Sequence, residues 1–130
     1  MYIASDIEKI AKAFKKVLAK HKLKYEITFC NNYKAIKIED LTPDSKDEML
    51  YMWIRLFNIK DTYTYDVEIA NISIPKQYRR NGILTEMVKE LNKCRYVNKI
   101  KFISVCTAEM KNWCDKNGFK PYNFGSDYSN

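Results

Sequence analysis

Residues 67–91 read VEIANISIPKQYRRNGILTEMVKEL, and this stretch decides how the chain folds. An apolar strand pattern runs up to Ile74 and ends at Pro75, which cannot continue the hydrogen-bond ladder of a sheet. After a basic turn, apolar residues recur at helical spacing from Ile83 to Leu91. The stretch therefore predicts a β-strand, a turn and the N-terminus of an amphipathic helix.

The turn between this strand and this helix has the features of a phosphate-binding site. The chain has only three glycines, so Gly82 at the start of the helix indicates that the backbone must approach something closely there. A helix N-terminus offers unpaired N–H groups and a partial positive charge, and Arg79 and Arg80 add two fixed charges beside it. The alternative is an ordinary strand–turn–helix connection with two solvated arginines.

The pattern Arg79-x-x-Gly82-x-Leu84 after a strand resembles the acyl-CoA-binding loop of the GNAT acetyltransferase superfamily. That loop is usually written as Arg or Gln, two residues, Gly, one residue, and Gly or Ala. Leu84 departs from the pattern, because a small residue is expected at its position. A larger side chain there affects how tightly the loop can contact the pyrophosphate.

A second segment, WCDKNGF at residues 113–119, ends a short helical pattern with Gly118 and continues with Phe119. It resembles the last helix of the same superfamily, which commonly ends in a Gly-Phe pair. The resemblance covers about residues 66–122 of the chain.

The resemblance implies an α/β (α+β) fold in one GNAT-like domain over residues 1–130. Its mixed, mostly antiparallel sheet is flanked by helices, and its central strands splay apart to admit the pantetheine arm of acetyl-CoA, the co-substrate. In the superfamily the strand before the loop pairs with the pantetheine amides, and the loop holds the pyrophosphate. The matching cofactor-binding residues are Ile72, Ser73, Ile74, Arg79, Arg80, Asn81, Gly82, Ile83 and Leu84.

The composition limits the classes of function. The chain has 130 residues, 46% of them hydrophobic, and no apolar run approaches the length of a membrane span. Its first residues show no secretory signal, so we expect a cytoplasmic protein with no membrane partner. Its one histidine and four cysteines form no Cys-x-x-Cys pair or zinc motif, and His21 is not placed for serine hydrolase chemistry. We expect no metal cofactor.

The N-terminal segment has the apolar spacing of an amphipathic helix over residues 5–20. Ser5 and Glu8 predict a capping box at the start of this helix. Alternating residues on both sides of Asn31-Asn32 then predict a β-hairpin. We expect its strands over residues 25–29 and 33–38, followed by a turn at residues 42–45.

The segment 49–59 is ambiguous. Its apolar spacing fits a helix, whereas its aromatic, β-rich composition and its continuation into residues 63–74 fit a hairpin, and we favour strands. Further along, the pattern predicts a buried strand over residues 100–106, a helix over 107–117 and a strand over 119–124.

The last six residues, 125–130, are polar and are expected to fray. If they do, the final strand that is usual in the superfamily is missing or is contributed by another subunit. This reasoning leaves a homodimer open.

Glu68 is the candidate general base for amine acetylation. It lies six residues before Ile74, where the lysine-acetylating branch of the superfamily carries a glutamate base. Period-two alternation places Glu68 on one face with Ala70, Ile72 and Ile74, an apolar setting that disfavours a charged carboxylate and so favours proton uptake. The alternative is a solvated carboxylate paired with a lysine.

Cys114 is the candidate proton donor to the leaving CoA thiolate. The superfamily often places a tyrosine in this role four residues before the glycine of the Gly-Phe pair, and here that position holds a cysteine. A thiol can donate a proton but is shorter than a tyrosine. The alternative is that Cys114 packs as a small apolar residue, and Tyr122 is the nearest tyrosine that could replace it.

The net charge of +7 includes a row of lysines at helical spacing on the first helix. A solvated polar face is the ordinary interpretation, and a phosphate-rich partner such as tRNA or another nucleic acid is the functional one. The row consists of Lys9, Lys12, Lys16 and Lys20, with Lys22 and Lys24 just beyond.

Together these features predict an N-acetyltransferase that moves an acetyl group from acetyl-CoA to a primary amine by direct attack in a ternary complex. The acceptor can be a protein or a small molecule, since similar cofactor loops serve many amines. The alternative is a non-catalytic GNAT-fold module that binds protein or nucleic acid through its lysine-rich helix. The off-pattern residues Leu84 and Cys114 support that alternative.

Overall fold

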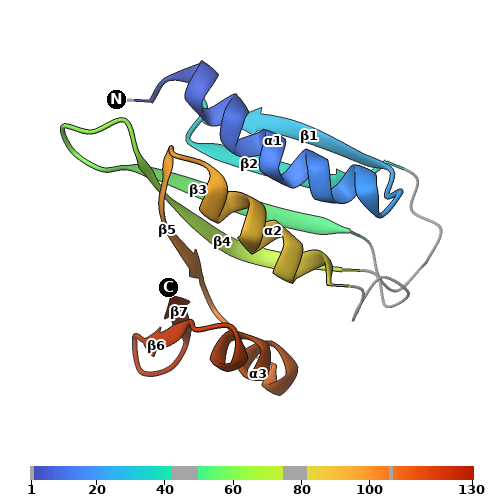
Figure 1. The fold of residues 1–130 in the computed structure, drawn as a ribbon, viewed down its shortest axis with the longest axis vertical. Helices are drawn as coiled ribbons and strands as arrows, with labels where there is room; N and C mark the ends of the chain where they lie inside the picture. The colour runs from blue at the N-terminus through green and yellow to red at the C-terminus, as the bar shows by residue number, and fades with distance from the viewer. Residues whose placement is uncertain (1, 42–49, 75–81, 106) are drawn as a thin grey trace.

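The computed structural model describes residues 2–41, 50–74, 82–105 and 107–130. Its strands form one seven-stranded sheet in the order β1-β2-β3-β4-β5-β7-β6 (Figure 1). The neighbours β4 and β5 are parallel and every other neighbouring pair is antiparallel, which confirms the predicted mixed, mostly antiparallel sheet. The elements are α1 (Ala4–Lys20), β1 (Tyr25–Cys30), β2 (Ala35–Asp40), β3 (Tyr51–Asn58), β4 (Tyr65–Ser73), α2 (Ile83–Lys93), β5 (Val97–Phe102), α3 (Ala108–Lys116), β6 (Lys120–Tyr122) and β7 (Asp127–Ser129).

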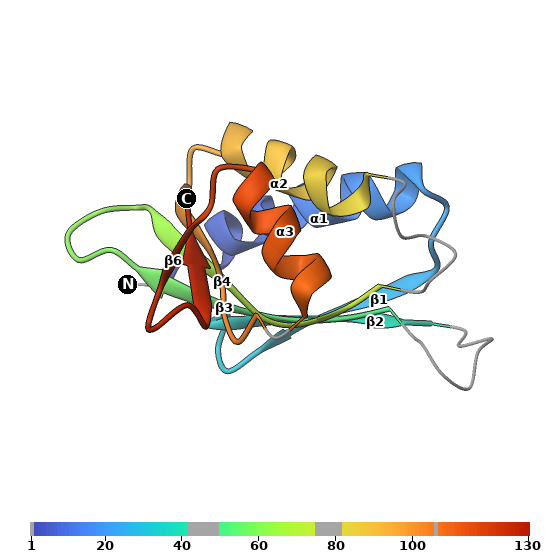
Figure 2. The ribbon, with the colours of Figure 1, turned by 90° about the horizontal axis from the view of Figure 1, so that it is seen from below.

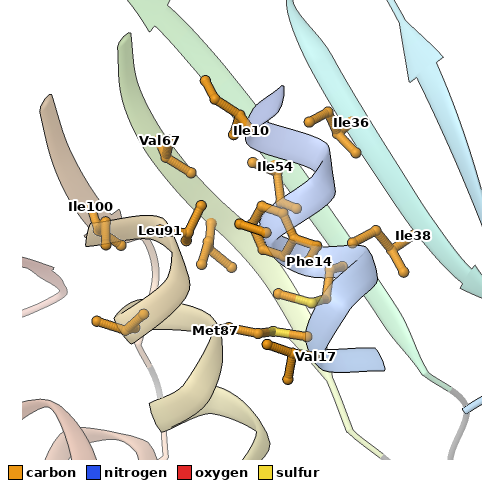
Figure 3. Close-up of a cluster of buried hydrophobic side chains, with 14 of the residues drawn as sticks. Ile10, Phe14, Val17, Ile36, Ile38, Ile54, Val67, Met87, Leu91 and Ile100 are labelled. Atoms are coloured by element: carbon orange, nitrogen blue, oxygen red, sulfur yellow. The ribbon is translucent and has the colours of Figure 1, made fainter. Parts of the chain in front are cut away.

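Helices α1 and α2 lie side by side on one face of the sheet (Figures 1 and 2). Their apolar faces pack against the strand residues that point toward them, and Figure 3 shows Phe14 and Leu91 among Ile38, Ile54 and Val67. All five side chains are fully buried. Burying a side chain of this size stabilises the fold by about 1.5–3 kcal/mol, so this layer positions the strands that carry the site.

The predicted helix over residues 5–20 is confirmed, but its predicted capping box is wrong. The N-cap is Ile3, which makes no side-chain capping bond, and Ser5 lies within the helix. The backbone N–H of Ile3 donates instead to the hydroxyl of Tyr65 at 3.1 Å. A buried tyrosine of β4 therefore fixes the helix start, which local sequence cannot reveal.

Both hairpins before the site are confirmed. The first turn contains Asn31, Asn32 and Tyr33 with φ angles of 53°, 54° and 66°, a conformation that asparagine tolerates better than most residues. The ambiguous segment forms the strand β3 from Tyr51 onward and is not a helix. Met49 and the predicted turn at residues 42–45 lie outside the described residues.

A β-bulge in β4 changes which residues share a face. Trp53 pairs with Asn71 but Ile54 pairs with Ile69, so Ala70 is the extra residue. Beyond the bulge Ile72 lies opposite Met52, on the core face. The predicted common face of Glu68 and Ile72 is therefore wrong, because a single inserted residue reverses the alternation.

The C-terminal segment was expected to fray, and this prediction is wrong. Its residues form β7, which pairs with β6 and lies between β6 and β5. Asp127 and Tyr128 are 7% and 5% exposed. The final strand comes from this chain itself, so it gives no reason to expect a second subunit.

The strands around α3 differ from the predicted ranges. β5 runs from Val97 to Phe102 and ends before residues 103–106, because the chain turns at Ser104 with a φ angle of 56°. β6 covers only Lys120–Tyr122 of the predicted strand over 119–124. Among the described residues, no helix is long and apolar enough to cross a membrane.

Candidate functional site

The strands β4 and β5 separate in the middle of the sheet. Their parallel pairing ends at Ile69, which lies opposite Phe102 and accepts a hydrogen bond from the N–H of Ile103 at 3.0 Å. Beyond this point β4 continues along β3 up to Ser73. Within the described part of the chain, β4 beyond Ile69 has a strand neighbour on one side only, so backbone groups on its other edge face the opening.

The β6–β7 hairpin holds the chain after β5 away from β4. The carboxylate of Asp127 accepts a hydrogen bond from the backbone N–H of Ser104 at 2.9 Å, and the carbonyl of Ser126 accepts one from Val105 at 2.7 Å. Asn123 also donates to Asp127, at 2.6 Å. The bonds that Asp127 accepts from Ser104 and then from Asn123 hold its pKa below its usual range.

A cavity of about 590 Å³ occupies the opening, a size that suits a small-molecule ligand. Its walls are the end of β4, the turn after β5, and the first turns of both α2 and α3. The lining residues include Ile72, Ser73, Ile74, Gly82, Ile83 and Leu84, which are six of the nine residues predicted to bind the cofactor. The other three, Arg79, Arg80 and Asn81, lie outside the described residues.

The start of α2 presents its backbone to this cavity. Its N-cap is Gly82, with a φ angle of 77°, and no side chain caps the helix. Among the described residues other than its chain neighbour, no heavy atom lies within 4 Å of the position that a Cβ on Gly82 would take, so the glycine serves the left-handed backbone conformation. Ile83 is 2% exposed, so its side chain packs in the core while its N–H belongs to the open first turn.

The start of α3 faces the same cavity, which the sequence did not predict. Thr107 is its N-cap and accepts a hydrogen bond from the N–H of Met110 at 3.1 Å. Two helix N-termini therefore point their partial positive charge at one space. Glu109 also lines the cavity and brings one negative charge. A threonine after a strand pattern signals the start of a helix. It gives no sign that this helix start will lie beside the start of α2.

The Gly-Phe segment builds the wall of the cavity. Gly118, with a φ angle of 80°, lies just after α3, and Phe119 is 3% exposed and stacks edge-on against Phe102 at 5.1 Å. Trp113 packs against both rings and lines the cavity. Its indole N–H donates to the hydroxyl of Thr85 at 3.2 Å, which links α3 to α2.

Cys114 does not line the cavity. It is fully buried in the hydrophobic core, and burial, with a smaller effect of the Asp115 charge, raises its pKa to about 11. The thiol therefore keeps its proton at neutral pH, but it lies among apolar side chains. This position favours the packing interpretation over the proton-donor interpretation.

Glu68 has a polar setting, so the predicted apolar surroundings are wrong. Its carboxylate forms an ion pair with the guanidinium of Arg55 on β3 at 2.5 Å, and its side chain is 14% exposed. Both residues lie opposite each other in the sheet register, and Lys101 of β5 is the other neighbour of Glu68. The β-bulge places Glu68 on the opposite face of the sheet from Ile72, which lies on the core face. The predicted alternative was a solvated carboxylate paired with a lysine; the carboxylate is paired, but its partner is an arginine and its side chain is mostly buried.

Tyr122 lies in the electrostatic environment of Glu68. Burial, followed by the charges of Asp127, Glu68 and Asp66, raises the pKa of Tyr122. Its phenol therefore remains protonated in neutral solution. The fold brings the phenol of Tyr122 and the carboxylate of Glu68 into electrostatic contact close to the point where the strands separate.

The lysine row on α1 is largely engaged within the protein. Lys16 and Lys20 form ion pairs with Glu90 and Glu86 of α2 at 3.3 and 2.6 Å. Lys9 donates to the hydroxyl of Tyr96 at 3.2 Å. Lys16 and Lys20 are thus paired with acids of α2, which offsets part of the positive charge of the row, although both side chains stay mostly exposed.

Comparisons with known proteins show similarity in structure only. No family model and no curated protein sequence matches the chain. Arabidopsis thaliana Naa50, solved in complex with the bisubstrate analogue CoA-Ac-MVNAL, is similar with a TM-score of 0.45 and 14% identity, over 73% of this chain and 69% of that chain. Ard1 from Thermoplasma volcanium is similar with a TM-score of 0.41 and 14% identity, over 98% of this chain and 90% of that chain.

Proposed function

We propose that this protein is an N-acetyltransferase that binds acetyl-CoA between β4 and β5 and transfers the acetyl group to a primary amine in a ternary complex. The single observation that carries the proposal is the cavity itself. A one-sided strand edge and two helix N-termini line the same space.

This combination suits the chemistry of acetyl-CoA. The pantetheine arm carries amides that can pair with the backbone of a strand, as Ile72, Ser73 and Ile74 would provide. The pyrophosphate is a dianion that suits the uncapped first turn of α2, where Gly82, Ile83 and Leu84 lie. Arg79, Arg80 and Asn81, which precede that turn in the sequence, would add charge and N–H donors.

The transfer requires a neutral amine and a protonated leaving thiolate. We assign the first task to Glu68, whose carboxylate would accept the proton of the acceptor ammonium, directly or through water. We assign the second task to Tyr122 in preference to Cys114, because the phenol is partly exposed whereas the thiol, which also keeps its proton, is fully buried. Arg55 would then hold Glu68 in place for the acceptor.

The second candidate function is a non-catalytic GNAT-fold module that binds a protein or a nucleic acid. Two observations favour it. The Glu68 carboxylate is already paired with Arg55, and Cys114 is sealed in the core. In this case the cavity would bind CoA, or stay empty, without turnover.

Isothermal titration calorimetry with acetyl-CoA and with CoA tests the cavity. A CoA-release assay over a panel of lysine peptides, N-terminal peptides and polyamines then tests the chemistry. Saturable binding with turnover supports the enzyme, and saturable binding without turnover on any amine supports the module. Absence of binding would refute the cofactor assignment.

A further inference from the structure

A second cavity, of about 440 Å³, lies at the opposite ends of β4 and β5 from the first. Its walls come from the start of α1, the loop before β4 and the turn before β5, segments that meet at the N-terminal end of α1 (Figure 1). The residues that line it are Ile3, Asp6, Tyr63, Thr64, Arg95 and Tyr96. The proposed acetyl transfer uses none of them.

Asp6 lies in the wall of this cavity. The residue is 7% exposed. Among the described residues, the buried side-chain polar atom without a hydrogen-bond partner is Nε of Arg55, so the oxygens of Asp6 are not buried without a partner. A carboxylate that is accessible from the cavity can accept charge-assisted hydrogen bonds from a cationic ligand.

Arg95 lies on the wall of the same cavity and contacts the adjacent Tyr96. Its guanidinium donates to the hydroxyl of Tyr96 at 2.7 Å and lies 4.9 Å from the centre of the ring. Lys9 donates to the same hydroxyl at 3.2 Å. The hydrogen bonds from Arg95 and then Lys9 lower the pKa of Tyr96, so both cations are fixed around one oxygen.

Asp6 and Arg95 interact electrostatically but do not form an ion pair. The Tyr96 contact, with a smaller effect of the Asp6 charge, raises the pKa of Arg95. Both residues line the cavity, so a ligand in it can reach a negatively charged and a positively charged side chain. A ligand that carries both charges would satisfy both residues at once.

We propose that this cavity binds a small zwitterion of the amino-acid class. The ligand ammonium binds the carboxylate of Asp6, and the ligand carboxylate binds the guanidinium of Arg95. Thr64 offers a hydroxyl, and Tyr63, which is 70% exposed, offers an aromatic surface for the ligand side chain. The proposal is independent of acetyl transfer, because the site lies at the other end of the parallel strand pair.

Backbone amide NMR titration of the full chain tests this site with three small probes. Glycine carries both charges, methylammonium only the positive one and acetate only the negative one. We expect glycine to shift the Thr64, Arg95 and Tyr96 resonances saturably, with an affinity at least about tenfold above that of either singly charged probe.

Two variants assign the charges. Asp6→Asn and Arg95→Gln should each weaken glycine binding by about tenfold or more. Glu8→Gln is the matched control, because Glu8 is an exposed carboxylate on α1 outside the cavity, and it should bind glycine as the natural chain does. Melting temperatures of the three variants separate lost binding from lost folding.

No saturable glycine shift at these resonances would overturn the proposal. Equal affinity for methylammonium and glycine would overturn the role of Arg95 and with it the zwitterion. Should Asp6→Asn fail to fold, Arg95→Gln still decides, because Arg95 is exposed and its loss removes no core packing. Unchanged glycine affinity in Arg95→Gln would refute the site.

Discussion

The sharpest test of the cofactor site is Gly82→Ala, because this chain contains its own control. Gly82 and Gly125 have φ angles of 77° and 83°, and at both positions no atom of the described residues, chain neighbours aside, lies within 4 Å of an added Cβ. Each substitution therefore introduces the same left-handed strain and no steric clash with those residues. Only Gly82 lines the cavity.

The expected loss of stability follows from that strain. An L-residue in the left-handed conformation costs about 1–2 kcal/mol. A chain of 130 residues has an unfolding entropy of about 270 cal/mol/K near 60 °C, so each kcal/mol lowers Tm by about 4 °C. We expect both alanine variants to melt about 4–7 °C below the natural chain.

Binding of acetyl-CoA should separate the two variants. If the pyrophosphate lies against the first turn of α2, a methyl group on Gly82 obstructs it, and calorimetry should show an affinity at least about tenfold lower. Gly125→Ala should bind acetyl-CoA normally, and the bulkier Gly82→Trp should bind it least. Equal affinity in Gly82→Ala, Gly82→Trp and Gly125→Ala, with all three folded, would refute the site.

Four further predictions concern the groups around the opening. Glu68→Gln should lower turnover about a hundredfold at neutral pH with acetyl-CoA affinity nearly unchanged, and full turnover between about pH 6 and 9 would exclude Glu68 as the base. Cys114→Ala should lower Tm, because it leaves a small cavity in the core, and should leave turnover per folded molecule unchanged. Cys114→Tyr should overpack the core. Slowed turnover in the alanine variant, together with normal or faster turnover in the tyrosine variant, would instead identify the thiol as the proton donor. Tyr122→Phe should slow turnover about a hundredfold if the phenol protonates the leaving thiolate, and an unchanged kcat would exclude this role. Because the pKa of Tyr122 is raised, the natural chain should keep its activity up to alkaline pH. Asp127→Asn weakens the hydrogen bond from Ser104 and should lower the free energy of unfolding by about 1.5–3 kcal/mol at pH 7. Because the folded pKa of Asp127 is lowered, its stabilising contribution is present above the unfolded pKa and is lost as the pH falls through the folded pKa. Urea unfolding at pH 7 and at about pH 3 should therefore show a smaller difference between variant and natural chain at the lower pH, and a constant difference would contradict the charge assignment.

Much of the fold could be predicted because its signals are local. The helical spacing of apolar residues such as Phe14 marks the inner face of α1, and this periodicity needs no knowledge of the partner strands. The pair Asn31-Asn32 tolerates the positive φ angles that the first hairpin turn requires. Gly82 marks the point where strand and helix meet, again through its backbone freedom.

The setting of the candidate catalytic groups could not be predicted in the same way. One extra residue at Ala70 reverses the alternation of β4, and strand pairing with β3 decides where that residue is accommodated. The partner of Glu68 is therefore Arg55, a residue 13 positions away that only the sheet register brings opposite. A polar C-terminus likewise gives no local sign that Asp127 will bond to Ser104.

The sequence by itself determined the order of the elements and the glycine-marked turn before α2, because periodicity and backbone preference act over a few residues. Only the tertiary structure decided that two helix starts share one cavity, that Cys114 is sealed away from it, and that Asp6 and Arg95 face a second one. Register, long-range hydrogen bonds and burial depend on segments far apart in the chain. Their energies are settled only when those segments pack together.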